Sequence, residues 1–170
     1  TLVDAGHILG SSIVRMRLTA PGAGRDTVIV FSGDLGRPGT PILRDPTIVS
    51  EADIVLCEST YGGREHEAAG QAIDTLAAVV SETARKNGVL LIPSFAIGRT
   101  QEIVWELHRL VDSGRIPQLP LYLDSPMASH ASDIYRAHPE AYDEETAALL
   151  AAHEAPLDFP GQQVIQNVQE

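Results

Sequence analysis

The distribution of apolar residues changes near Tyr61, and this change most constrains what the sequence can fold into. Before Tyr61 the apolar residues form short runs separated by turn residues, a pattern typical of β-strands. After Tyr61, long segments with apolar residues at three- and four-residue spacing alternate with short apolar runs. That alternation is typical of α/β folds. We therefore expect an α/β protein, with a β-rich front over residues 1–61 and an α/β part over residues 62–170.

The front part predicts a β-hairpin followed by a further strand. Residues 12–18 and 27–31 are strand-like runs, and the polar, glycine-bearing residues 21–26 lie between them. Residues 54–57 form a third apolar run, whose shortness is typical of a buried strand.

The second part predicts helices and strands in alternation. Helices are expected at 68–86, 100–111, 127–137 and 140–153, and strands at 89–92 and 121–123. This order favours a parallel sheet with crossover helices. The sequence opens without Met, and its last ten residues show no closing element, so we expect a section of a longer protein, cut at both ends.

Composition limits the classes of partner. The net charge of −11 argues against a general nucleic-acid coat, because such binding depends on Lys and Arg neutralising phosphates. A nuclease stays possible, since a metal can supply positive charge locally. The single Cys57 cannot form an intramolecular disulfide, and no apolar run approaches the ~20 residues that span a bilayer. We expect a cytoplasmic protein without a membrane partner.

Three polar residues lie beside strand-like segments. His7 lies in a glycine-flanked loop before residues 12–18, Asp34 follows residues 27–31, and Glu58 follows residues 54–57. If the strands are neighbours, these residues converge at one edge of a sheet, which spacing alone does not establish. Each also has a structural interpretation: His7 as a surface residue, Asp34 as a turn former and Glu58 as a helix cap or a partner of Arg64.

Five motifs in a fixed order resemble those of the β-CASP nucleases of the metallo-β-lactamase superfamily. They are DAGHILGS at 4–11, FSGDLGR at 31–37, ESTYG at 58–62, IPSFAIGRTQE at 92–102 and LDSPMA at 123–128. The sequence is most similar to the RNA-processing members, akin to mRNA 3′-end cleavage factors. The resemblance implies the last part of a metallo-β-lactamase sandwich over residues 1–61 and the first part of a β-CASP lobe over residues 62–170.

The resemblance also implies roles for the three strand-end residues. His7 corresponds to a zinc ligand, Asp34 to a catalytic carboxylate shared by two zinc ions, and Glu58 to the catalytic acidic motif that orients a His supplied from elsewhere. Two zinc ions would activate a water and hold the oxygens of an in-line displacement at phosphorus. The family's His-x-His-x-Asp-His cluster and its two later His motifs have no counterpart in this sequence.

A substrate-binding role is expected for Ser94 and Arg99. Both lie between an expected strand and an expected helix, where backbone N–H groups and a guanidinium can receive phosphate. Arg99 can equally be a solvent-facing residue of the first helical turn.

The leading hypothesis is a section of a zinc-dependent ribonuclease, with two Zn²⁺ per complete site and RNA as partner. DNA as substrate, endonucleolytic or 5′-exonucleolytic cleavage and a homodimer all stay open. A non-catalytic binding or assembly module of the same fold is the alternative. A Rossmann-type nucleotide-binding domain ranks last, because the 94–98 turn lacks the G-x-G-x-x-G pattern.

Overall fold

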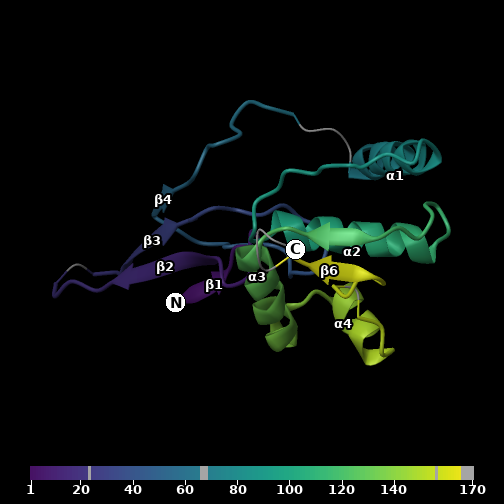
Figure 1. The fold of residues 1–170 in the computed structure, drawn as a ribbon. Helices are drawn as coiled ribbons and strands as arrows, with labels where there is room; N and C mark the ends of the chain where they lie inside the picture. Colours follow the sequence, from purple (N-terminus) through teal and green to yellow (C-terminus); the bar gives the residue numbers. More distant parts are fainter. Residues whose placement is uncertain (23, 66–68, 156, 166–170) are drawn as a thin grey trace. The chain divides into compact units, whose positions relative to one another are not determined.

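The computed structural model describes residues 1–22, 24–65, 69–155 and 157–165 (Figure 1). The chain forms two compact units: unit 1 comprises residues 1–63 and 140–145, and unit 2 comprises residues 64–139 and 146–170. The four strands of the first sheet lie in unit 1 and the three longer helices in unit 2, so the protein is mixed α/β. The assignment of residues 1–61 and 62–170 to two named domains stays a prediction.

Unit 1 contains a four-stranded sheet in the order β1-β2-β3-β4. Its strands are β1 (Leu2–Asp4), β2 (Ser12–Leu18), β3 (Thr27–Phe31) and β4 (Ile54–Leu56). The β2–β3 pair is antiparallel, which confirms the predicted hairpin. The predicted strand at 54–57 is present as β4 but is exposed along its length, so the expectation that it is buried is wrong. β1 was not predicted from the sequence.

The directions of the strands bring the C-terminal ends of three of them to one edge of this sheet. β2 is antiparallel to both β1 and β3, and β4 is parallel to β3. β1, β3 and β4 therefore run in the same direction and end at the same edge. One core of unit 1 is formed by Ala5, which follows β1, together with Ile13 of β2 and Val28 and Val30 of β3.

Residues 140–145 belong to unit 1 through backbone contacts with residues 42–44. Leu43 and Tyr142 form an isolated antiparallel bridge, and Asp143 N–H donates to the Ile42 oxygen at 2.9 Å. Ile42 and Tyr142 are both buried. This pairing explains why the predicted helix over 140–153 is wrong in its first part: the chain forms a short 3-10 helix, Pro139–Ala141, and only then α4 (Glu144–Ala151).

Unit 2 is built on three amphipathic helices. They are α1 (Ala69–Arg85), α2 (Arg99–Asp112) and α3 (Pro126–Ala137), close to the predicted bounds. Ala68, the first residue of the predicted first helix, lies outside the described residues. A shared core packs α1 against α2 and is formed by Ala77, Val80, Val104, Leu107, Leu110, Ile116 and Phe159.

The strands of unit 2 differ from the prediction. β5 (Leu121–Leu123) is confirmed and pairs in parallel with β6 (Gln162–Val164), a strand that the sequence analysis did not predict. Residues 89–92 do not form the predicted strand. A strand exists only where a neighbour accepts its hydrogen bonds, and none of the described strands pairs with this segment. Val89 and Leu91 are 85% and 82% exposed there.

Among the described residues, no helix combines the length and the apolar character needed to cross a membrane.

Candidate functional site

His7, Asp34 and Glu58 lie in three loops at the same edge of the first sheet. His7 is in the connection between β1 and β2, Asp34 follows β3, and Glu58 follows β4. Because β1, β3 and β4 run in the same direction, all three loops leave the sheet at one edge. The convergence that the sequence could not establish is therefore present at the level of the strand ends.

The loop that carries Asp34 packs directly on the loop that carries His7. Gly36 N–H donates to the Ala5 oxygen at 2.8 Å. A Cβ atom on Gly36 would overlap the main-chain oxygen of Gly6, so this approach requires glycine. On the far side of the His7 loop, the N–H groups of His7 and Ile8 donate to Ser11 Oγ at 3.1 and 3.2 Å, which closes a tight turn.

Ser32 joins the Asp34 loop to the Glu58 loop. Its side chain is buried, and its Oγ accepts the Glu58 N–H at 2.9 Å while donating to the Gly33 oxygen at 2.6 Å. Its own N–H donates to the Leu56 oxygen at 2.9 Å and extends the β3–β4 ladder by one residue. The sequence analysis did not select Ser32, since a serine before a Gly-Asp pair looks like any turn residue.

Hydrogen bonds hold the Glu58 carboxylate in its ionised form. Glu58 Oε2 accepts the Thr60 N–H at 2.8 Å. This bond, followed by the Thr60 hydroxyl, lowers the pKa of Glu58 below its ordinary value; the Leu35 N–H and the charge of His7 lower it further against the opposing effect of burial. Glu58 is therefore an acceptor of hydrogen bonds at neutral pH and not a donor of protons.

His7 and Asp34 are exposed, and Glu58 is half-buried. Imidazole and carboxylate are ligand types that zinc accepts. No set of three or more His, Cys, Asp and Glu side chains lies close enough to hold a metal ion, within the ranges that the structure describes. The sheet edge thus gathers ligands of the right type, in a number too small for a complete site.

Ser94 and Arg99 lie at the start of α2 in unit 2. Ser94 Oγ and Thr100 Oγ1 are 2.9 Å apart, and Thr100 Oγ1 donates to the Phe95 oxygen at 2.8 Å. Arg99 Nη1 is 2.7 Å from Glu102 Oε2, and the Arg99 side chain is 57% exposed.

The backbone N–H groups at the start of α2 are already hydrogen-bonded within the loop. Arg99 N–H donates to the Ile97 oxygen at 3.1 Å and Thr100 N–H to the Phe95 oxygen at 3.2 Å. Gly98 N–H donates to Gln101 Oε1 at 2.8 Å. These three N–H groups already have acceptors within the loop, and the expected phosphate contact of this segment stays a prediction. Because Thr100 Oγ1 donates to the Phe95 oxygen, the Ser94 hydroxyl donates to Thr100, and the Arg99 guanidinium is the donor best placed to meet an anion at this loop.

Comparison with known proteins finds one matching family and several similar proteins. The Beta-Casp domain family matches residues 100–170. Ribonuclease TTHA0252 of Thermus thermophilus is 35% identical over 98% of this chain and 37% of its own length. Transcription termination factor FttA of Methanosarcina mazei is 35% identical over 88% of this chain and 23% of its own. RNase J-like protein of Methanocaldococcus jannaschii is 31% identical over 79% of this chain and 31% of its own. The chain thus spans well under half the length of these relatives.

Proposed function

The chain belongs to the β-CASP proteins of the metallo-β-lactamase superfamily, and from this premise we propose that it is a section of a zinc-dependent ribonuclease. One observation carries the proposal. The parallel strands β1, β3 and β4 end at one sheet edge and are followed there by His7, Asp34 and Glu58. A non-catalytic module has no physical need for an imidazole and two carboxylates at one edge.

The residues of this edge fit zinc by type. His7 offers an imidazole nitrogen and Asp34 a carboxylate that can bridge two cations. Both side chains are exposed, whereas their backbones are fixed by the Gly36–Ala5 and Ser11 hydrogen bonds. Further ligands would come from other parts of the parent protein, because these two side chains do not complete a tetrahedral site.

Bound zinc would supply Lewis-acid polarisation of a phosphoryl oxygen and a nucleophile active at neutral pH. The chain's own residues would orient that chemistry. Asp34 and His7 would be the residues of this chain that hold the zinc ions. The Glu58 carboxylate, which stays ionised, would accept a hydrogen bond from an imidazole and set its tautomer.

RNA is the substrate that the relatives' names favour, since two of them are called ribonuclease or RNase. Contact with the phosphate backbone would be local, because the net charge of −11 opposes general attraction of a polyanion. We assign that contact to Arg99, whose guanidinium has N–H groups beyond the one that faces Glu102, and to Ser94, whose hydroxyl would have to turn away from Thr100 Oγ1 to donate to a phosphate. The parent protein would act in the cytoplasm.

The test compares full-length parent protein with the isolated 170-residue chain on labelled RNA with added zinc. We expect chelator-sensitive cleavage by the parent, abolished by Asp34→Ala and unaffected by Asp112→Ala, which alters an exposed carboxylate at the end of α2. The isolated chain should be inactive and bind zinc weakly, because zinc affinity depends on ligand number and on a preformed site. An Asp34→Ala parent with full activity would contradict the proposal and favour the non-catalytic module.

A further inference from the structure

Gln101 is a fully buried polar side chain at the start of α2, with an exposed fraction of 0%. Burying an amide is unfavourable unless its hydrogen bonds are satisfied. Gln101 Oε1 accepts the Gly98 N–H at 2.8 Å, and Nε2 lies 3.2 Å from the Ala96 oxygen. The amide thus bonds to two residues of the loop that connects Ser94 to Arg99.

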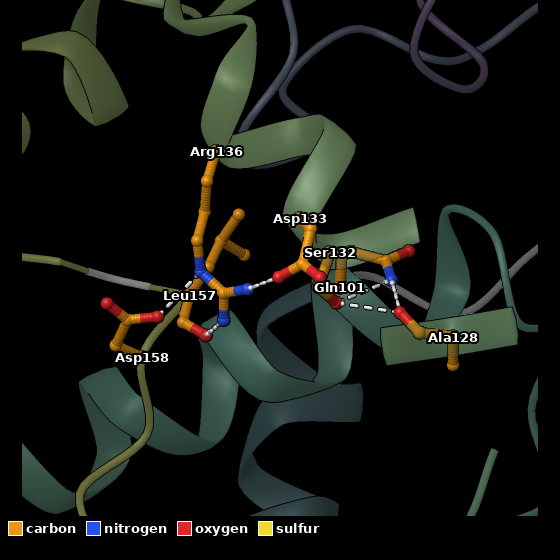
Figure 2. A network of polar contacts seen from close by, with 7 residues as sticks. All are labelled: Gln101, Ala128, Ser132, Asp133, Arg136, Leu157 and Asp158. Carbon is orange, nitrogen blue, oxygen red and sulfur yellow. Dashed lines mark hydrogen bonds and ion pairs between the residues drawn. The ribbon is translucent and has the colours of Figure 1, made fainter. Parts of the chain in front are cut away.

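The other contacts of the Gln101 amide are to α3. Nε2 lies 3.3 Å from the Ala128 oxygen and 3.0 Å from Ser132 Oγ, as Figure 2 shows. Ser132 Oγ donates its own proton to the Ala128 oxygen at 3.0 Å, so it can accept from Gln101. One side chain therefore fastens the loop to the neighbouring helix.

These contacts fix which way the amide points. If the amide were reversed, its NH₂ group would face the Gly98 N–H and its oxygen would face the carbonyl oxygens of Ala96 and Ala128. The reversed amide would therefore place a donor against a donor and an acceptor against acceptors. In a buried place such unpaired polar groups reduce the stability of the fold. Gln101 therefore has one satisfied orientation and holds the loop in one conformation.

The loop contains a tight turn next to Arg99. Gly98 has φ +82° and ψ −75°, and the Arg99 N–H donates to the Ile97 oxygen across it at 3.1 Å. This is a γ-turn of the rare kind, and its positive φ is open to Gly98 because glycine has no Cβ. One hydrogen bond closes this turn, and the Gly98 N–H is held in addition by Gln101.

Helix α3 is itself anchored on the side away from the loop. Arg136 Nη1 bonds to Asp133 at 2.9 Å and Nε to Asp158 at 2.7 Å, while Nη2 donates to the Leu157 oxygen at 3.1 Å (Figure 2). The Arg136 network ties α3 to the segment before β6. Helix α3 is therefore held by Gln101 through Ala128 and Ser132, and by Arg136 near its last residue.

We propose that Gln101 is a positioning residue that sets the conformation of residues 94–99 for contact with a substrate phosphate. The inference rests on the proposed function, which gives Ser94 and Arg99 that contact. Gln101 does not touch substrate itself. Without its amide the γ-turn at Gly98 opens, and the backbone that carries the Arg99 side chain is no longer held in one position.

The test uses full-length parent protein with Gln101→Met, which keeps the size and removes the hydrogen bonds. The matched control is Val104→Ala, a change at a buried apolar residue of the same helix that lies away from the loop. We expect Gln101→Met to raise KM for RNA about tenfold with kcat within about twofold, as expected for a lost binding geometry. Val104→Ala should lower Tm and leave KM unchanged. An equal KM rise in both variants would overturn the positioning role.

Hydrogen exchange gives a second readout that does not depend on activity. The Gly98 amide should exchange faster in Gln101→Met than in Val104→Ala, because only the first loses its acceptor. If Gln101→Met does not fold, Ser132→Ala takes its place, with a smaller KM rise and faster exchange at Gly98. Exchange identical to that of the unaltered protein would overturn the inference.

The Arg99→Ala parent separates the two proposals. If Arg99→Ala raises KM and Gln101→Met changes neither KM nor exchange, the role of Gln101 is overturned and the substrate contact stands. If Arg99→Ala leaves KM unchanged, the substrate contact is overturned and the role of Gln101 falls with it.

Discussion

The main-chain N–H of Gly36 donates to the main-chain oxygen of Ala5 at 2.8 Å, which joins the loop after β3 to the loop after β1. Neither residue offers chemistry of its own. Their bond limits the distance between the backbones of Asp34 and His7, because Asp34 lies two residues before Gly36 and His7 lies two residues after Ala5. The geometry of the sheet edge thus depends on residues that carry no functional group.

Gly36→Ala should disrupt this edge. The added methyl group would overlap the Gly6 oxygen, and backbone atoms cannot move aside as a flexible side chain can. We expect a loss of about 3 kcal/mol in the free energy of unfolding, the upper part of the range for overpacking. Urea unfolding of the parent protein measures it. Gly70→Ala is the control, since a Cβ there meets nothing within 4 Å. Equal stability of the two variants would contradict the close approach.

Ser32→Ala should weaken the connection between the Asp34 and Glu58 loops. The change leaves the Glu58 N–H without its acceptor in a part-buried place. We expect a loss of about 1–3 kcal/mol, the usual cost of one unsatisfied group. The exposed Ser50 provides the matched Ser→Ala control. Chemical denaturation measures this loss. A Ser32→Ala protein as stable as Ser50→Ala would show that the hydrogen bond between Ser32 and Glu58 contributes nothing to the free energy of unfolding.

Asp53 should make the stability of unit 1 depend on pH. The Val28 N–H, at 2.8 Å from Oδ2, and then Arg25, at 2.6 Å from Oδ1, lower the pKa of Asp53 below its ordinary value of 3.8. A lowered pKa means that the ionised carboxylate stabilises the folded state above pH 3.8 and that this contribution is lost as the pH falls through the folded-state pKa.

The measurement is the difference in Tm between the unaltered protein and Asp53→Asn across a pH series. It should be largest near neutral pH and shrink below pH 3.8. Arg25→Ala separates the two causes, since the Val28 bond remains and only part of the difference should disappear. A difference that stays constant down to acid pH would rule out the ionised carboxylate as its source.

Arg99→Ala should reduce the salt dependence of RNA binding. Each phosphate contact adds roughly one to the slope of log K against log salt concentration, and removal of one cation lowers the slope by about that amount. Arg85→Ala is a matched control, because Arg85 also pairs with a glutamate three residues away and is 68% exposed, against 57% for Arg99. Binding titrations at several salt concentrations give the slopes; equal slopes for the two variants would remove Arg99 from the interface.

Local patterns in the sequence were sufficient to predict an element where its own residues include both the strand or helix pattern and the turn that ends it. The 12–31 hairpin has a turn between two strand-like runs, and α1 ends close to the predicted Asn87-Gly88 stop. The signal failed where long-range pairing decides. Residues 89–92 are apolar without a neighbouring strand among the described residues, whereas the polar segment Gln162–Val164 becomes β6 because β5 accepts it.

The candidate site divides in the same way. His7, Asp34 and Glu58 could be selected because each follows a strand or a glycine-rich loop, which local sequence shows. Asp34 and Glu58 meet through the parallel pairing of β3 with β4, and His7 joins them through β1, which is too short to give a pattern. Ser32 and Gln101 were missed because each role depends on hydrogen bonds to residues 26 or more positions away, and residue type alone does not reveal such partners.

The parallel pairing of β3 with β4 also sets an order of events in folding. The β2–β3 hairpin can form from neighbouring residues, but β4 joins only after residues 32–53 have closed a long connection. Closing such a connection is slow relative to forming a hairpin. We therefore expect Glu58 to reach the edge last during folding, and to leave it first when the sheet begins to unravel.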